Sequence, residues 1–151
     1  MNLNSVIFFM ITLAVIGMAV LIGLWTYNTT AYNSNVHALT LDMSHFTSLV
    51  FTYWKTPVVG GGAGEDVTQF DIAKLSGFMG MAHIISDKPH KEYYSSITEN
   101  GEIRVISITG NVVVLMGLGK QLRNKRFPTV TCTVNLYSFT VNTITGNAVG
   151  F

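Results

Sequence analysis

With 151 residues, the chain has room for one small domain of roughly one hundred residues besides a long N-terminal apolar segment. Charged residues make up only 11% of the chain, against a usual share of about 25%. Because the formal net charge is only +1, there is no overall electrostatic case for binding nucleic acid or acidic substrates. The low charge content instead predicts apolar surface that is shared with lipid or between subunits.

The segment from Leu3 to Tyr27 contains no charged residue and no proline. At ~1.5 Å of rise per helical residue, a segment of this length can cross the ~30 Å hydrocarbon core of a bilayer. A domain of this size cannot bury such a helix on all sides. We therefore expect it to lie in lipid, in a bundle of its own copies, or in each at different times.

No charged residue precedes Asp42. A secretory signal peptide carries a positively charged region before its apolar run, and an ordinary membrane anchor is oriented by flanking Lys or Arg. An uncharged, apolar start therefore favours a mature product whose basic leader has been removed.

Two features within the apolar segment leave alternatives open. Gly17 and Gly23 are weak helix formers, so they either permit close approach of a neighbouring helix or let the helix loosen between them and stretch or bend. Asn2, Asn4 and Ser5 precede the main apolar block. They either hydrogen-bond the amino terminus of a neighbour or lie at the edge of the membrane.

Downstream of Tyr27, apolar residues recur at alternating spacings of four and three, which places them on one face of a helix. Thr56-Pro57 ends the helix because proline disfavours helical geometry in the residue before it. We therefore predict one helix over residues 2–55, with an apolar front half and an amphipathic rear half. The predicted seam consists of Tyr32, Val36, Leu39, Met43, Phe46, Val50 and Tyr53.

The globular region begins with Val58–Gly64, VVGGGAG, which predicts a flexible linker. Glu65-Asp66 suits the start of a short helix over about residues 67–76, because acidic groups favour the positive end of the helix dipole. The expected organisation is an apolar helix that lies in lipid or in a bundle of its own copies (1–27), an amphipathic continuation (28–56) and a globular domain (57–151).

From residue 93 the apolar period changes to two, which is typical of strands. Residues 93–98 and 103–108 predict a hairpin, with Asn100-Gly101 supplying the positive φ angles of a type I′ turn. Residues 112–116 predict a third strand, and 129–144 one or two more. Three to five antiparallel strands would cover the seam, giving an α+β fold with a sheet on the rear half of a long helix.

The stretch 119–126 carries four of the nine basic residues. Three interpretations are open: a solvated turn, a subunit contact with the acidic residues Glu65, Asp66 and Asp71, or a surface for adhesion or DNA, although nucleic-acid sites normally have more charge and interleaved aromatic residues. The basic residues are Lys120, Arg123, Lys125 and Arg126.

The sequence offers no catalytic or cofactor motif, so we do not expect an enzyme. His37 and His45 are two helical turns apart with no cysteine or carboxylate to complete a ligand set, which predicts polar-face residues rather than a metal site. Cys132, between Val130 and Val134, predicts a buried inert thiol. The sequon at Asn28 permits glycosylation in a suitable external compartment. The four histidines are His37, His45, His83 and His90.

Residues 14–21, AVIGMAVL, are similar to the Val/Ala-Ile-Ile-Gly-Ile-Leu-Ala segment of the type IV pilins. The uncharged apolar helix, its amphipathic continuation, the Gly-rich loop and the antiparallel sheet also resemble that filament superfamily. Met1 at the first position is more like the type IVb branch. The chain departs from the family in having Ser5 where pilins usually carry Glu, no proline in the apolar helix, and a single cysteine.

The resemblance implies a structural subunit of a helical surface filament, serving adhesion, motility, DNA uptake or conjugation. It implies leader removal by a prepilin peptidase, N-methylation of Met1, insertion in the cytoplasmic membrane, and extraction by an assembly machine into an extracellular homopolymer. The alternative is a single-pass membrane protein that does not polymerise, or a minor pilin or secretion pseudopilin. Without a charge at position 5, register would rest on contacts between globular domains and on packing of Phe8, Phe9, Ile11, Val15, Leu21 and Leu24, which together with Ser5 are the residues predicted to pack in the filament core.

Overall fold

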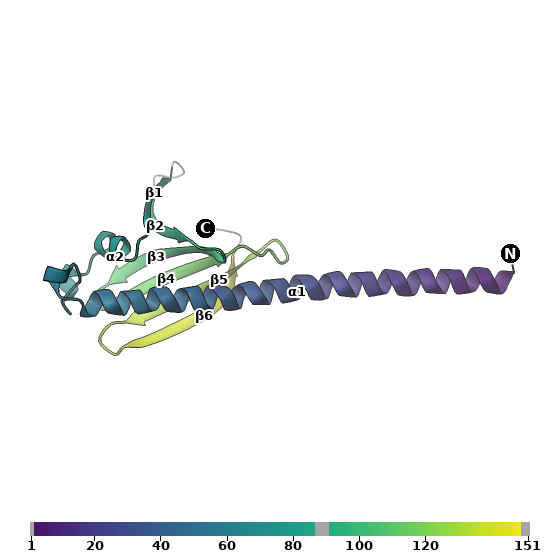
Figure 1. Cartoon of the computed structure of the whole chain (residues 1–151), viewed down its shortest axis with the longest axis horizontal. Coiled ribbons are helices and arrows are strands. Elements are labelled where there is room, and N and C mark those ends of the chain that lie inside the picture. The colour runs from purple at the N-terminus through teal and green to yellow at the C-terminus, as the bar shows by residue number, and fades with distance from the viewer. Residues whose placement is uncertain (1, 87–90, 149–151) are drawn as a thin grey trace.

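A single long helix and an antiparallel sheet make up most of the molecule (Figure 1). The computed structural model describes residues 2–86 and 91–148. The sheet lies along the rear half of the helix, and the front half projects beyond it. This arrangement confirms the predicted α+β class. The elements are α1 (Leu3–Lys55), the 3-10 turns η1 (Val58–Gly60) and η2 (Val67–Gln69), α2 (Ile72–Phe78), and the strands β1 (Ala82–Ser86), β2 (Lys91–Ile97), β3 (Gly101–Thr109), β4 (Val112–Gly119), β5 (Phe127–Asn135) and β6 (Thr140–Ala148).

Helix α1 begins and ends almost where its sequence predicts. It ends at Lys55 because Thr56, which precedes Pro57, is extended with ψ of 128°. Several of its Ser and Thr hydroxyls form hydrogen bonds with backbone carbonyls of the preceding turn of the helix. The Thr40, Thr47 and Thr52 hydroxyls each donate to the carbonyl oxygen four residues earlier, at 2.8–2.9 Å. A hydroxyl satisfied within the helix needs no other partner.

The predicted loosening between Gly17 and Gly23 is wrong for this structure, because α1 is helical without interruption from Leu3 to Lys55. A glycine costs a helix only about 1 kcal/mol relative to alanine. None of the other described segments comes within 4 Å of the side-chain position of either glycine, where it could take over backbone hydrogen bonds released by a break. Both glycines therefore remain ordinary helical residues.

The seam on the rear half of α1 is the centre of the core. Six of its seven residues are buried, and Leu39, Met43 and Val50 are completely so. Val36 is half-buried. The seam faces β4 and β5, whose inward residues alternate along each strand. These strand residues are Val113, Leu115, Val130, Cys132 and Val134.

The segment Val58–Gly64 is a folded cap on α1, so its prediction as a flexible linker is wrong. The backbone N–H groups of Ala63, Gly64 and Glu65 donate to carbonyl oxygens in the last turn of α1 and at Thr56, at 2.8–2.9 Å. Gly61 and Gly64 have φ of 84° and 63°, which lets the chain turn back on the helix. The terminal carbonyls of a helix need such partners, so the glycines here shape a cap.

The predicted helix over 67–76 is also corrected: two short elements, η2 and α2, replace it. Two aspartates divide the segment because each caps the element that follows. The Asp66 side chain accepts hydrogen bonds from the N–H and the hydroxyl of Thr68, at 2.8 and 2.7 Å. Asp71 accepts from the N–H of Lys74 at 3.4 Å.

In the described part of the chain, the sheet has six strands in the order β1-β2-β3-β4-β5-β6, all antiparallel, rather than the three to five predicted. The sequence pattern missed β1, whose five residues mix polar and apolar side chains. Residues 129–144 fall in two strands, β5 and β6. They pair over nine residues and are joined by the turn that follows Asn135.

The hairpin between β2 and β3 is present, but its predicted type I′ turn is wrong because neither Asn100 nor Gly101 has positive φ. The Thr98 hydroxyl instead accepts from the N–H groups of both residues, at 3.3 and 3.2 Å. The turn is also tied to α1. The Thr98 hydroxyl and the Asn100 amide donate to Asp42, at 2.8 and 2.9 Å. Bonds to the helix therefore decide the turn geometry.

Glycine at position 101 is required by space rather than by backbone angle. A Cβ atom there would lie 2.1 Å from the carbonyl oxygen of Leu118. We expect Gly101→Ala to lower the free energy of unfolding by about 3 kcal/mol or more, since backbone must move to admit it. Gly110 has φ of 57° and open space around it, so Gly110→Ala should cost only about 1 kcal/mol. Chemical denaturation of the full chain in detergent micelles would compare the two, and equal losses would contradict this explanation.

The Asp66 cap predicts a dependence of stability on pH. Hydrogen bonds from Thr68 lower the pKa of this carboxyl below 3.8, its ordinary value. A lowered folded-state pKa means that the stabilisation is complete above 3.8 and is lost as the pH falls below it. The difference in thermal unfolding midpoint between the native chain and Asp66→Asn should therefore shrink in strong acid. A difference that is the same at neutral and strongly acidic pH would refute the assignment.

Candidate functional site

The largest exposed apolar surface is the front half of α1. Every described residue from Asn2 to Asn28 is exposed to solvent, and among the described residues α1 is the one helix long and apolar enough to cross a membrane. Exposure reaches 73% for Phe8 and 68% for Leu21. All seven residues predicted to pack in a filament core lie on this exposed stretch; Met1, the predicted methylation site, lies outside the described residues.

These side chains do not share one face. At ~100° per residue, Phe8 and Leu24 project about 160° apart around the helix axis. A helix that is apolar on opposite sides cannot be satisfied by one partner on one side. The arrangement suits immersion in lipid or contact with several neighbouring helices, but not docking on a single groove.

A second feature is the turn between β4 and β5, the part of the sheet domain that reaches farthest toward the N-terminal half of α1 (Figure 1). Arg123 and Arg126 exchange two backbone hydrogen bonds, at 2.9 and 3.0 Å. Asn124 and Lys125 between them have φ of 52° and 61°. Positive φ at both central residues is the geometry of a type I′ turn, so this turn type occurs here and not at Asn100-Gly101.

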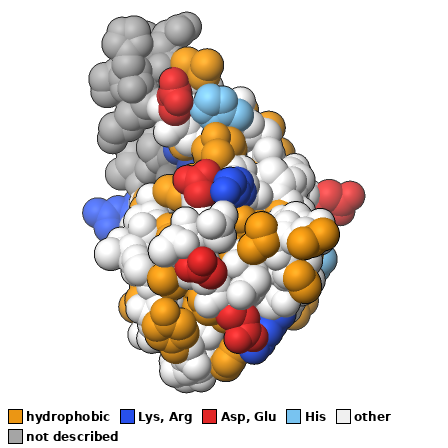
Figure 2. Space-filling view, turned by 90° about the vertical axis from the view of Figure 1, so that its left-hand side faces the viewer, with side chains coloured by type: hydrophobic (Ala, Val, Ile, Leu, Met, Phe, Trp, Pro, Cys, Tyr) orange, Lys and Arg blue, Asp and Glu red, His pale blue; other side chains and the backbone are white. Residues whose placement is uncertain are grey.

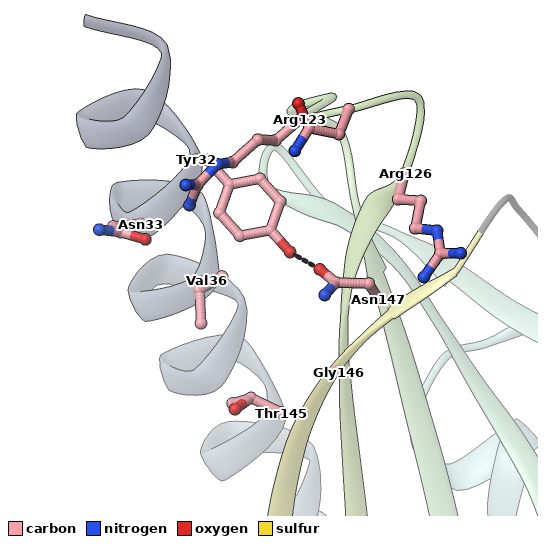
Figure 3. Close-up of a pocket in the computed structure, with 9 residues that line it drawn as sticks. Tyr32, Asn33, Val36, Arg123, Arg126, Thr145, Gly146 and Asn147 are labelled. Atoms are coloured by element: carbon pink, nitrogen blue, oxygen red, sulfur yellow. Dashed lines mark hydrogen bonds between the residues drawn. The ribbon is translucent and has the colours of Figure 1, made fainter. Parts of the chain in front are cut away.

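A cleft of about 650 Å³ lies between this turn, the end of β6 and α1 (Figure 3). The Tyr32 hydroxyl donates to the side-chain oxygen of Asn147 and so connects α1 to β6 across the cleft. The Arg123 guanidinium lies 5.8 Å from the centre of the Tyr32 ring. Figure 3 shows the guanidinium groups of Arg123 and Arg126 on either side of the Tyr32–Asn147 pair. Val36 is only half-buried because it lines this open cleft.

The four basic residues of the stretch 119–126 have different roles. The Lys120 ammonium donates to the Thr98 carbonyl oxygen at 2.7 Å, and its backbone N–H donates to Asn35 on α1 at 3.0 Å. Lys120 therefore helps to hold the turn on the helix. Lys125 is exposed, whereas Arg123 and Arg126 line the cleft.

The acidic residues of the predicted subunit contact do not meet the basic stretch within one chain. Glu65 pairs with Lys55 at the end of α1, while Asp66 and Asp71 cap η2 and α2. These elements form the end of the molecule remote from the N-terminus, where acidic and hydrophobic side chains are interspersed on the surface (Figure 2). A contact between the two charged regions would require two copies and stays a prediction.

The described residues contain no group of three or more histidine, cysteine or acidic side chains that could hold a metal ion. His37 and His45 are exposed on α1, whereas His83 stacks on Tyr94 and lies 3.4 Å from Glu92. His90 lies outside the described residues. Cys132 is buried, with its Sγ 3.4 Å from the Thr143 hydroxyl.

Comparisons with protein-family models, curated proteins and solved structures find no match to this chain. Its function must therefore be inferred from the two surfaces described above, the exposed apolar half of α1 and the basic cleft. The sequence pattern identified the first directly. It missed the cleft because Tyr32 and Asn147 are 115 positions apart, and the pattern gives no sign of their pairing. The run Arg123-Asn124-Lys125-Arg126 was the only local feature of the sequence that pointed to this cleft.

The left-handed conformation of Lys125 predicts that glycine there is stabilising. A left-handed conformation costs an ordinary residue about 1–2 kcal/mol, and glycine avoids this cost. We expect Lys125→Gly to raise the free energy of unfolding by about 1 kcal/mol, after the greater freedom of glycine in the unfolded chain is counted. Lys120→Gly is the control, since Lys120 is not among the residues with positive φ. Denaturation in detergent micelles should show it to be destabilising; stabilisation by both changes would argue against the strain.

Proposed function

We propose that this chain is a structural subunit of a helical surface filament of the type IV pilus kind. It is held in the cytoplasmic membrane by the front half of α1 before assembly, and lies in an extracellular fibre afterwards. The observation that carries the proposal is the continuity of one helix between two environments: its front half is apolar on all sides and exposed, and its rear half is fixed to a sheet.

The energetic argument starts from the apolar area. On the order of 1,000 Å² of exposed apolar helix, at about 25 cal/mol per Å², corresponds to roughly 25 kcal/mol. That exceeds the 5–15 kcal/mol by which domains are typically stable. A monomer with this surface in water is therefore strongly disfavoured. Lipid, or the equivalent helices of neighbouring subunits, supplies the missing burial.

The geometry supports polymerisation around a common axis. About 29 residues of α1 precede Tyr32, the first seam residue, and at ~1.5 Å per residue they extend some 40 Å beyond the sheet. The sheet domain is much wider than a single helix (Figure 1). Front halves gathered in a bundle would leave the wider domains on the outside, which is the arrangement of a fibre with an apolar centre.

Ser5 has a specific consequence for assembly. A carboxylate at this position would pair with the amino terminus of a neighbour, and a serine hydroxyl supplies no charge. Register along the fibre must then come from side-chain packing around α1 and from contacts between sheet domains. Ser5 is also the observation that favours the alternative, a single-pass membrane protein or minor subunit that does not form fibres. Electron microscopy of sheared surface material distinguishes the two, since only a filament subunit yields uniform fibres that contain this chain.

Val15 lies in the middle of the front half and is 56% exposed. We expect Val15→Lys to leave the sheet domain folded and to abolish fibres, because a charge at the centre of a helix bundle has no partner there. Val15→Leu, which keeps an apolar side chain, should retain them. Membrane fractionation checks that both variants reach the bilayer, where a central lysine costs about 2.5–3.5 kcal/mol. Normal fibres from Val15→Lys would contradict packing through the front half.

A further inference from the structure

We propose that the cleft between α1 and the β4–β5 turn binds the phosphate of an anionic lipid headgroup while the subunit is in the membrane. This inference rests on the proposed function only in requiring that the front half of α1 spans the bilayer. The cleft is defined by Tyr32 and Val36 on α1, Arg123 and Arg126 on the turn, and Asn147 on β6.

The position of the cleft along α1 supports a headgroup as its ligand. The apolar segment ends at Tyr27, and Tyr32 follows five residues later, ~7 Å farther along the helix axis. Each polar layer of a bilayer is about 5–8 Å thick. Trp25 and Tyr27 are 66% and 71% exposed at the end of the apolar segment, where aromatic residues favour the membrane interface. The Tyr32 end of the cleft therefore lies at the outer limit of the polar layer, and the β4–β5 turn that carries the arginines is the part of the sheet domain closest to it (Figure 1).

Among the described residues, the charges that line the cleft are of one sign. They are Arg123 and Arg126, and none of the described lining residues is an aspartate or a glutamate. None of the described carboxylates forms an ion pair with either arginine. Arginine is suited to phosphate because its planar fork can donate two hydrogen bonds to one anion. The remaining polar lining is formed by asparagine and threonine side chains, which suits a phosphate ester better than an apolar ligand.

The scaffold holds the two arginines at this place. The exchanged backbone bonds of the type I′ turn keep Arg123 and Arg126 opposite one another. Asn35 fixes the base of the turn to α1 by accepting from the N–H groups of Lys120 and Gln121, at 3.0 and 3.2 Å. Lys125 adopts a left-handed conformation at the tip of the turn. Strain of this kind, kept in place by surrounding bonds, is a common property of binding turns.

The test uses the full chain in nanodiscs of phosphatidylcholine, with and without phosphatidylglycerol. Native mass spectrometry of the chain released into neutral detergent measures which lipid remains bound. We expect selective retention of phosphatidylglycerol. Each cation near an anionic surface contributes about a factor of five, so Arg123→Gln with Arg126→Gln should reduce retention about 25-fold.

Three controls make the result specific. Lys55→Gln with Lys74→Gln removes the same charge from the remote end of the domain and should leave retention unchanged; an equal loss would overturn the site in favour of general attraction. Arg123→Lys with Arg126→Lys keeps the charge and should preserve part of the binding. Far-ultraviolet circular dichroism and thermal unfolding confirm that each variant is folded, so that lost binding is not lost structure.

The remaining outcomes identify other occupants. Displacement of the lipid by inorganic phosphate at equal concentration would overturn the lipid assignment and indicate a site for soluble phosphate. Retention of both lipids to the same extent by the native chain and the arginine variant, together with loss of fibres from that variant, would indicate a contact with a second copy. Selective lipid retention by a chain that never forms fibres would refute the proposed filament and support the lipid site.

Discussion

The structure depends on one continuous helix whose two halves differ: the rear half is buried on one face, and the front half is apolar and exposed on all sides. The rear half of α1 has a narrow apolar seam, so one sheet face is enough to bury it. The front half is apolar all round, so no element of a single chain of this length can bury it. Because α1 is continuous, the sheet domain and the exposed half form one covalent rod. Whatever accepts the front half therefore also fixes the position of the sheet.

The sheet domain is held on the helix at both ends of the seam by polar contacts. At the remote end, the Val58–Gly64 segment returns to the last carbonyls of α1 and buries Ala63 completely. At the end nearest the N-terminus, Asn35 bonds to the β4–β5 turn, and Asp42 in the middle of the seam bonds to the β2–β3 turn. Apolar burial along the seam is non-directional, whereas these hydrogen bonds fix the register of the sheet along the helix axis. The rod therefore emerges from the domain at a defined place.

Periodicity could predict those parts of the fold in which burial of a residue depends on the face of its own helix or strand. The seam from Tyr32 to Tyr53 and the alternating strand residues were predicted because burial repeats with the element. The turns were mispredicted because distant side chains decide them: Asp42 on α1 holds Thr98 and Asn100, and thereby overrides the local preference of Asn-Gly. The glycines after Pro57 suggested a flexible linker. This prediction failed because the sequence does not show that the segment returns to cap the last carbonyls of α1.

The same distinction applies to the candidate sites. The front half of α1 can be identified from sequence alone by its continuous apolar composition. It is exposed on all sides, so its surface does not depend on contacts with other parts of the chain. The cleft depends on a bond between Tyr32 and Asn147 and on a left-handed lysine in the turn, and neither follows from a local pattern. The basic stretch was visible as charge, but its separation into a structural Lys120 and two cleft arginines required the fold.

The rod and the cleft also bear on how a subunit would leave the membrane. On the proposals above, extraction removes the apolar half of α1 from lipid and the two arginines from lipid phosphate in the same movement, since both are fixed to one rigid helix. Neighbouring front halves can replace the apolar contacts, but they carry no anion that could replace the phosphate. The arginines must then find water or the acidic residues at the remote end of another subunit. The apolar half thus sets the energy scale of assembly, and the cleft adds a smaller, salt-sensitive contribution at the point where the helix leaves the bilayer.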